Sequence, residues 1–202
     1  MWRAELRTTI RWLLKRRGIE VERPFSAEGK KRLRNLRLQE MDIRLDELEL
    51  VQSITERLDG QISSIVPTDH AAKLLDTLPG VAPYTALFLS STIGDVNRFP
   101  DSKHLCAYLG LVPSLHQSGD TLLTGHITKL GDKFLRRNMV ECARVAVRKD
   151  PRLREFYVRI RQKRGEKKAL IAVARKMVAY AYWMLKRDKT YEELLLGKNA
   201  ED

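Results

Sequence analysis

The feature that most constrains this chain is a stretch without proline, residues 27–65, in which Gly29 is the only glycine before Gly60. Side chains suited to a helix seam recur through it in steps of mostly three and four: Leu38, Met41, Leu45, Leu48, Val51, Thr55, Leu58, Ile62 and Ile65. That spacing predicts one long helix with a coiled-coil-like seam. At a rise of 1.5 Å per residue, the helix would be about 50–60 Å long.

Shorter signals frame this long helix. Residues 2–17 have the apolar spacing of a short amphipathic helix, and Gly18 is expected to end it. Ser26 is a candidate N-cap for the long helix, and Pro67 is expected to close it. A long helix that returns on a shorter one predicts an antiparallel helical arm over residues 1–66, which is also a candidate dimerisation element.

A compact domain is expected over residues 67–190, followed by a tail at 191–202. Its first part, LLDTLPGVAPYTALF, predicts a helix, a tight turn and a second helix. The pattern resembles a helix-hairpin-helix, whose turn brings backbone N–H groups close to a phosphate. Gly80, Val81 and Ala82 are therefore candidate nucleic-acid contacts. Ala82 stands where such a turn usually has its second glycine, and a plain helical corner is the competing interpretation.

The rest of the domain is also expected to be helical. Asp101 or Ser102 is a candidate N-cap, a further helix is expected to begin near Asp132, and Asp150-Pro151 should end it. The predicted fold class is all-α (mainly), with a long antiparallel arm followed by a compact helical domain. No apolar run reaches 18 residues, so we expect no helix that spans a bilayer.

The positive charge of the chain is concentrated in one half. Between Asp101 and Lys189 there are 21 Lys and Arg against 8 Asp and Glu, whereas the remainder is close to neutral. This imbalance predicts a polyanionic partner, most simply DNA or RNA, and a solvated basic surface is the simpler alternative. The basic helices supply further candidate nucleic-acid contacts: Arg161, Lys163, Arg164, Lys167 and Lys168.

The cysteines and histidines bear on location and metal binding. Cys106 and Cys142 have no CxxC spacing, and the four histidines are scattered. The pattern predicts two reduced thiols, a cytoplasmic protein and no structural zinc. No metal site and no cofactor are expected in this chain.

The stretch HQSGDTLLTGHITKLGDKFLRR, residues 116–137, shows neither a helical nor a strand period and is expected to be a flexible loop before a basic helix. Ser118 lies in this loop. A serine hydroxyl among cations is a candidate nucleophile toward a DNA phosphodiester, although loop serines are more often turn formers or caps. His116 or His126 is conceivable as its base. The cations that follow are candidate phosphate ligands: Lys129, Lys133, Arg136 and Arg137.

Several short motifs follow one another in order over residues 68–187. They are Pro79-Gly80-Val81, Ile93-Gly94-Asp95 with Arg98-Phe99, Tyr108-Leu109-Gly110-Leu111 with Pro113, Ser118-Gly119, Gly125-x-Ile127-x-Lys129-x-Gly131 with Leu135-Arg136, and Ala172-Val173-Ala174-Arg175-Lys176. The ordered set resembles the C-terminal domain of the DEDD-type insertion-sequence transposases, which are recombinases guided by a bridge RNA.

The resemblance implies a mechanism and partners. In that family the C-terminal domain contributes a serine that attacks the DNA backbone and forms a phosphoserine intermediate. By its Ser-Gly motif this serine is Ser118, with Ser114 as the fallback. The implied partners are DNA (insertion-sequence ends and target), a guide RNA and further copies of the chain, as a dimer or tetramer formed through the arm.

One part of the family pattern is missing from this sequence. The family's first half is an RNase H-like domain whose Asp/Glu/Asp/Asp carboxylates bind divalent metal, so Mg²⁺ is expected only with that domain. The acids of the arm, such as Asp42, Asp46, Glu47 and Glu49, are interpreted as its solvated surface. The chain is therefore expected to be a transposase fragment, inactive alone. The alternatives are a non-catalytic nucleic-acid-binding module, an inactive remnant and a dimerising scaffold.

Overall fold

The computed structural model describes residues 2–118, 121–128 and 130–198. For residues 113–118, 121–126 and 197–198 it describes the backbone alone. The chain divides into two compact units, Met1–Gln61 and Ile62–Asp202. Most described residues are helical, which confirms the predicted fold class, and a two-stranded antiparallel sheet is the exception among them.

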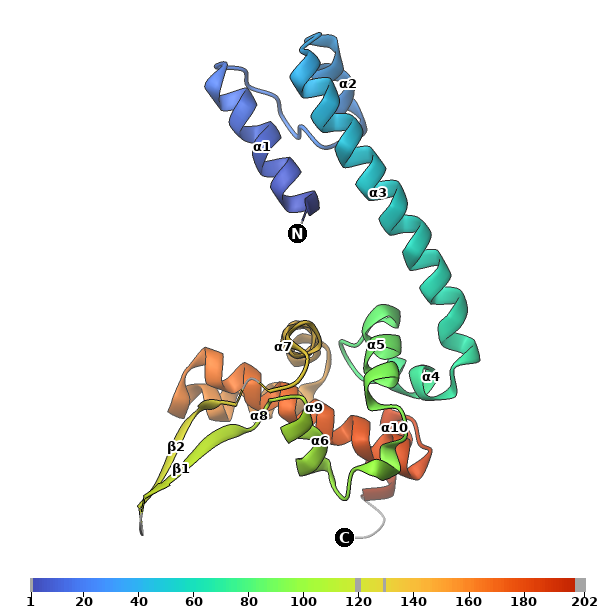
Figure 1. Ribbon diagram of the computed structural model, residues 1–202, viewed down its shortest axis with the longest axis vertical. Coiled ribbons are helices and arrows are strands. Elements are labelled where there is room, and N and C mark those ends of the chain that lie inside the picture. The colour runs from blue at the N-terminus through green and yellow to red at the C-terminus, as the bar shows by residue number, and fades with distance from the viewer. Residues whose placement is uncertain (1, 119–120, 129, 199–202) are drawn as a thin grey trace. The chain divides into compact units, whose positions relative to one another are not determined.

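The first unit contains helices α1 (Trp2–Arg16) and α2 (Ala27–Asn35) and most of α3 (Gln39–Ile65). Figure 1 shows α1 running beside the first half of α3 in the opposite direction. The two pack through an apolar cluster to which α2 adds Leu33; the other buried members are Ile10, Leu13, Leu14, Met41, Leu45 and Leu48. Ser26 is the N-cap of α2, as predicted, and its side chain accepts a hydrogen bond from the Gly29 amide at 3.0 Å.

The prediction of one uninterrupted helix from residue 27 to residue 65 is wrong. The helix breaks between Asn35 and Gln39, where Arg37 has a positive φ of 49°. Neither proline nor glycine marks the break. The turn lets α2 fold back on α3, so that Leu33 is buried and three ion pairs join the two helices. The remaining α3 has 27 residues, which corresponds to about 40 Å.

The seam of α3 is buried over only part of its length. Met41, Leu45 and Leu48 lie in the cluster with α1 and α2. Further along the seam, Thr55 is exposed and Leu58 is 48% exposed. Between about residue 52 and Gln61, where the first unit ends, α3 therefore has no apolar partner among the described residues.

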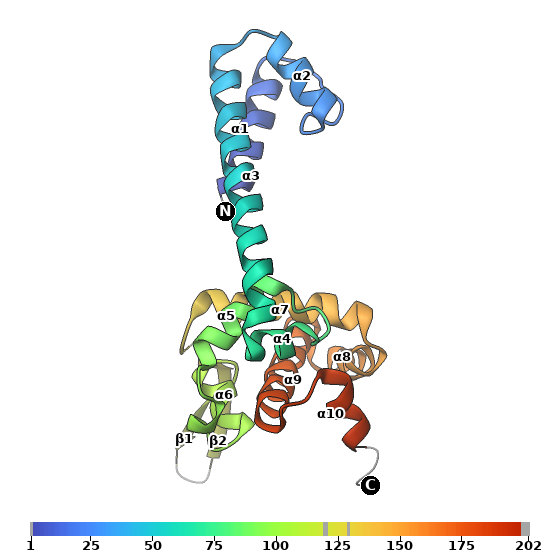
Figure 2. The same ribbon diagram turned by 90° about the vertical axis from the view of Figure 1, so that its right-hand side faces the viewer.

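The second unit is built around α9 (Glu166–Arg187). It packs against α4 (His70–Asp76), α6 (Ser102–Tyr108), α7 (Lys133–Lys149), α8 (Pro151–Arg164) and α10 (Tyr191–Lys198). Figure 2 shows α9 among these helices. Residues 191–198, considered a tail from the sequence, form α10, and Tyr191 and Leu194 lie in the core.

Aspartate side chains set the helix starts of this unit. Asp101 caps α6, Asp132 caps α7 and Asp150 caps α8, each by accepting a backbone N–H of the first turn. These three starts agree with the sequence signals. Two single-turn 3₁₀ helices, η1 (Val66–Thr68) and η2 (Val96–Arg98), complete the connections before α6.

The predicted loop contains a β-hairpin. Strands β1 (Pro113–Ser118) and β2 (Thr121–Ile127) pair antiparallel, with Ser118 opposite Thr121 and an irregularity between Pro113 and Leu115. The two residues between the strands, Gly119 and Asp120, lie outside the described residues. A Gly-Asp pair between short runs is itself a hairpin signal. The prediction of a flexible loop rested on the absence of a helical or strand period and did not consider this Gly-Asp signal, so it is wrong for the residues in β1 and β2.

No helix in the described part of the chain is long and apolar enough to cross a membrane.

Candidate functional site

The hairpin places the candidate serines within one strand. Ser118 is the last residue of β1, and Ser114 lies near its start. In Figure 1 the hairpin extends away from the helices of the second unit, so that Ser118 lies near its outer end. His116 is in β1 opposite Leu123, and His126 is in β2. The structure therefore places both serines and both histidines on one hairpin, of which only the backbone is described at these positions.

The cations predicted to follow the serine do not share one environment. Lys133 and Arg137, in the first turns of α7, are exposed. Arg136 is half-buried, and its Nη1 donates a hydrogen bond to the Leu130 carbonyl at 2.8 Å. The prediction for Lys129 falls outside the described residues. Two of the three described cations thus face solvent, and the third is occupied by the backbone of the segment before α7.

A second group of predicted cations lies where α8 meets α9. Gly165, with a positive φ of 79°, joins the two helices. Between residues 161 and 168 there are five cations and one acid, and that acid, Glu166, lies 3.6 Å from Arg144. All five cations are exposed: Arg161, Lys163, Arg164, Lys167 and Lys168. We call this group the α8–α9 tip. Its charge is suited to a polyanion.

The turn between α4 and α5 (Pro83–Ile93) has a packing role. Gly80 has a φ of 83°, and a Cβ placed on it would lie 2.4 Å from the Cys142 carbonyl oxygen of α7. A glycine is therefore required for the close approach of this turn to α7. Val81 packs partly against the core, whereas Ala82 is exposed and is the N-cap of α5 without a side-chain cap.

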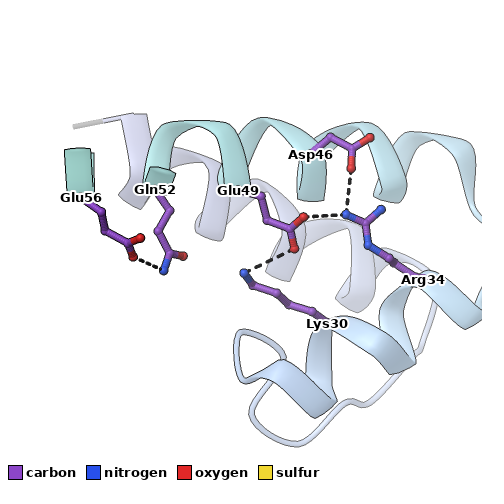
Figure 3. Close-up of polar contacts among 6 residues, drawn as sticks. All are labelled: Lys30, Arg34, Asp46, Glu49, Gln52 and Glu56. Atoms are coloured by element: carbon purple, nitrogen blue, oxygen red, sulfur yellow. Dashed lines mark hydrogen bonds and ion pairs between the residues drawn. The ribbon is translucent and has the colours of Figure 1, made fainter. Parts of the chain in front are cut away.

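The acids of the arm belong to the contact between α2 and α3. Arg34 donates hydrogen bonds to Asp46 and to Glu49, both at 2.8 Å, and Lys30 lies 3.5 Å from Glu49 (Figure 3). The hydrogen bonds to Asp46 and Glu49 raise the pKa of Arg34. Asp46 and Glu49 therefore contact α2, although their side chains stay 68% and 41% exposed. Glu47 pairs instead with Arg44 of the same helix.

The described residues offer no setting for a catalytic metal. No group of three or more His, Cys, Asp or Glu side chains in the described ranges is close enough to hold an ion. Asp46 and Glu49 are held by cations of α2. Within the described ranges there is thus no ligand set for Mg²⁺, an ion that the resemblance implies only together with an RNase H-like domain.

Both cysteines are free and buried, as predicted for reduced thiols. Burial raises the pKa of Cys106 and of Cys142. Since the thiolate is the nucleophilic form of cysteine, neither thiol is suited to covalent chemistry. The serine hydroxyls of the hairpin stay the candidate nucleophiles.

Comparison with known proteins identifies the second unit. Residues 72–158 match the family described as Transposase IS116/IS110/IS902. A protein of insertion element IS110 from Streptomyces coelicolor is 32% identical over 155 residues, which are 76% of this chain and 38% of that relative. A pilin gene-inverting protein from Moraxella bovis is 32% identical over 148 residues, which are 70% of this chain and 46% of the relative.

A third relative is the transposase of insertion sequence IS1111A from Coxiella burnetii, which is 28% identical over 137 residues, 66% of this chain and 38% of the relative. The chain thus contains a transposase domain. This domain is of the IS116/IS110/IS902 family, and the match spans α5, α6, the hairpin and α7. The resemblance to insertion-sequence transposases is confirmed at this level. The chain spans less than half the length of these relatives.

Proposed function

We propose that this chain is the strand-joining part of a DNA transposase or recombinase, with Ser118 as its nucleophile. The observation that carries the proposal is the place of Ser118: within the region that matches the transposase family, at the outer end of the hairpin. Two groups of exposed cations belong to the same unit, namely Lys133 with Arg137 and the α8–α9 tip. A nucleophile at a protruding end can reach a phosphodiester inside a DNA groove or branch.

The proposed step exchanges one phosphodiester for another. The Oγ of Ser118 attacks a backbone phosphorus and its proton passes to a base, while the bond from phosphorus to one DNA oxygen breaks and that oxygen gains a proton. The DNA is then joined to the protein through a phosphoserine. A hydroxyl of another strand reverses the step, reforming a DNA phosphodiester and releasing the serine. Nearby cations would stabilise the added negative charge of the transition state. Ser114 is the fallback nucleophile.

The partners follow from the same proposal. DNA, as insertion-sequence ends and target, would lie against the exposed cations, with a guide RNA as a further ligand in the cytoplasm. The exposed apolar side chains in the second half of α3 support assembly into a homo-oligomer, a dimer or tetramer. The backbone N–H of Ala82 would add a phosphate contact, whereas that of Val81 already donates to the Leu78 carbonyl at 3.0 Å.

A non-catalytic nucleic-acid-binding module, or an inactive remnant, is the second candidate function. It is favoured by the exposed cations of the α8–α9 tip, which can bind a phosphate backbone without any nucleophile. In this case the cations bind nucleic acid and Ser118 only shapes the hairpin.

Nucleic-acid binding is tested by measuring the affinity of the full chain for labelled duplex DNA over a range of salt concentrations. Binding of five phosphates by the α8–α9 tip would give a slope of about −4.5 in log affinity against log salt, because each contact releases condensed counterions. An affinity that does not change with salt contradicts both candidate functions.

The nucleophile is tested by a covalent adduct. The chain is incubated with labelled DNA, denatured and separated on a gel, beside the variants Ser118→Ala and Ser114→Ala. We expect an adduct that Ser118→Ala abolishes and Ser114→Ala retains. If Ser114→Ala abolishes the adduct and Ser118→Ala retains it, Ser114 is the nucleophile. Salt-dependent binding without any adduct supports the non-catalytic module.

A further inference from the structure

The base of the hairpin is a crossing of two backbone segments. Gly110 and Gly131 have positive φ values of 66° and 75°. A Cβ on Gly110 would lie 2.0 Å from the Leu130 carbonyl oxygen, and one on Gly131 would lie 2.1 Å from the Tyr108 carbonyl oxygen. The segments that enter and leave the hairpin therefore touch through their backbones, which only glycine permits at both positions.

One guanidinium joins the two segments at this crossing. Arg136 Nη1 donates to the Leu130 carbonyl at 2.8 Å and lies 3.5 Å from the Leu109 carbonyl, so a single group contacts the segments on both sides of the hairpin. Arg136 is itself held by α7. The Asp132 side chain caps that helix, and the neighbouring Leu135 is fully buried. The crossing is thus tied through Arg136 to the rigid start of α7.

The last residue of α6 is fixed from its other side. The Arg98 guanidinium lies over the rings of Phe99 and Tyr108, at 4.6 Å and 4.8 Å from their centroids, and it donates to the Thr92 carbonyl at 3.0 Å. Inside the crossing, the Thr128 amide donates to the Val112 carbonyl at 2.9 Å. The backbone on both sides of the hairpin base is therefore constrained by hydrogen bonds.

Beyond this base the hairpin has little support. In the described chain, β1 and β2 contact each other far more than they contact any helix, and Figure 1 shows them extending outward. The direction of the hairpin is therefore set where it begins. Its six-residue strand β1 is about 20 Å long, so a rotation of about 10° at the base moves Ser118 by about 3 Å. A displacement of about 1 Å can lower a reaction rate by about two orders of magnitude.

We propose that Arg136 is a positioning residue that fixes the direction of the hairpin, and thereby of Ser118, and that it does not bind a phosphate. The proposal rests on the function proposed above for Ser118. Arg137 is the matched control: it is adjacent in the same helix, exposed, and makes no ion pair within the described ranges. The two arginines therefore separate positioning from phosphate binding.

The test compares Arg136→Gln, Arg136→Lys and Arg137→Gln in three measurements: hydrogen exchange of the peptides covering residues 113–127, the salt slope of DNA affinity, and the yield of the covalent adduct. For Arg136→Gln we expect exchange at least about tenfold faster in these peptides, together with an unchanged salt slope and a reduced adduct yield. Arg136→Lys keeps the charge but not the planar donor pattern, so it should not restore protection. Arg137→Gln should leave exchange unchanged and reduce the slope by about 0.9.

Two results would overturn the proposal. One is unchanged exchange in Arg136→Gln together with a loss of salt slope that Arg136→Lys restores, which would make Arg136 a phosphate ligand. The second result concerns Gly131→Ala, the variant to be used if Arg136→Gln does not fold. Unchanged hydrogen exchange of the hairpin peptides in Gly131→Ala would overturn the proposal. If the wild-type chain forms no adduct, the proposed role of Ser118 fails, while the exchange data still decide whether Arg136 holds the hairpin.

Discussion

The carboxylate of Asp150 provides a sharp test of the packing of the second unit. Asp150 is 8% exposed, and each of its carboxylate oxygens accepts a hydrogen bond. Oδ1 accepts from the Leu153 amide at 2.9 Å, and Oδ2 accepts from the Tyr191 hydroxyl at 3.0 Å. Tyr191 is 3% exposed and meets the ring of Tyr180 edge-on. This contact joins α10 to the junction between α7 and α8.

The substitution Tyr191→Phe removes the donor and keeps the ring. It leaves one oxygen of a buried carboxylate without its hydrogen bond, which destabilises a protein by about 1–3 kcal/mol. For a unit of this size, a loss of about 2 kcal/mol lowers the melting temperature by about 4–8 °C. We therefore expect a decrease in that range, with α10 still folded.

The assay should report on the second unit alone. Trp183 lies in α9, whereas Trp2 and Trp12 lie in the first unit. Thermal unfolding is therefore followed by tryptophan fluorescence in a Trp2→Phe, Trp12→Phe background. Tyr84→Phe is the control, since Tyr84 is 51% exposed and its substitution should change stability by less than about 0.5 kcal/mol. A Tyr191→Phe protein that melts with the control would refute the role given to this hydrogen bond.

Two further predictions concern alkaline pH and the turn before α5. Burial and the charge of Asp150 raise the pKa of Tyr191 above its usual value, so the unfolded chain loses this proton first, and stability should fall as the pH rises above about 10. Tyr191→Phe should weaken that fall in a series of unfolding curves, and an equally steep fall would contradict the assignment. Gly80→Ala should destabilise the second unit by about 2 kcal/mol, because its Cβ would meet the α7 backbone at positive φ. Gly60→Ala, in an open part of α3, should stabilise by about 0.5–1 kcal/mol; equal effects of the two in chemical denaturation would count against this packing.

The parts of the fold that local signals determine were predictable. Asp101 and Asp132 mark helix starts in the sequence and cap helices in the structure. The Asp150-Pro151 pair ends α7, as predicted. In each case, side chains within a few residues of each other determine the outcome.

The parts that depend on distant contacts were not predictable. The arm helix breaks at Arg37 because the break lets α2 pack against α3. Leu33 is then buried, and Arg34 forms ion pairs with α3. These contacts join residues far apart in the sequence, so no local signal predicts them. Arg136 was one of four cations predicted as phosphate ligands, but its partners are the carbonyls of residues 109 and 130, which only the crossing of the chain brings near. The place of Ser118 on a hairpin is indicated locally by the Gly-Asp pair between the two strands, a signal that the prediction of a loop did not consider.

The central claim is that Ser118 becomes joined to DNA. The most direct measurement is mass spectrometry of the adduct after nuclease and protease digestion, which locates the attached nucleotide on one peptide and one residue. The account predicts a nucleotide phosphate on Ser118. A nucleotide attached at any other residue would contradict it, and so would DNA bound tightly with Ser118 unmodified in every condition that yields recombination.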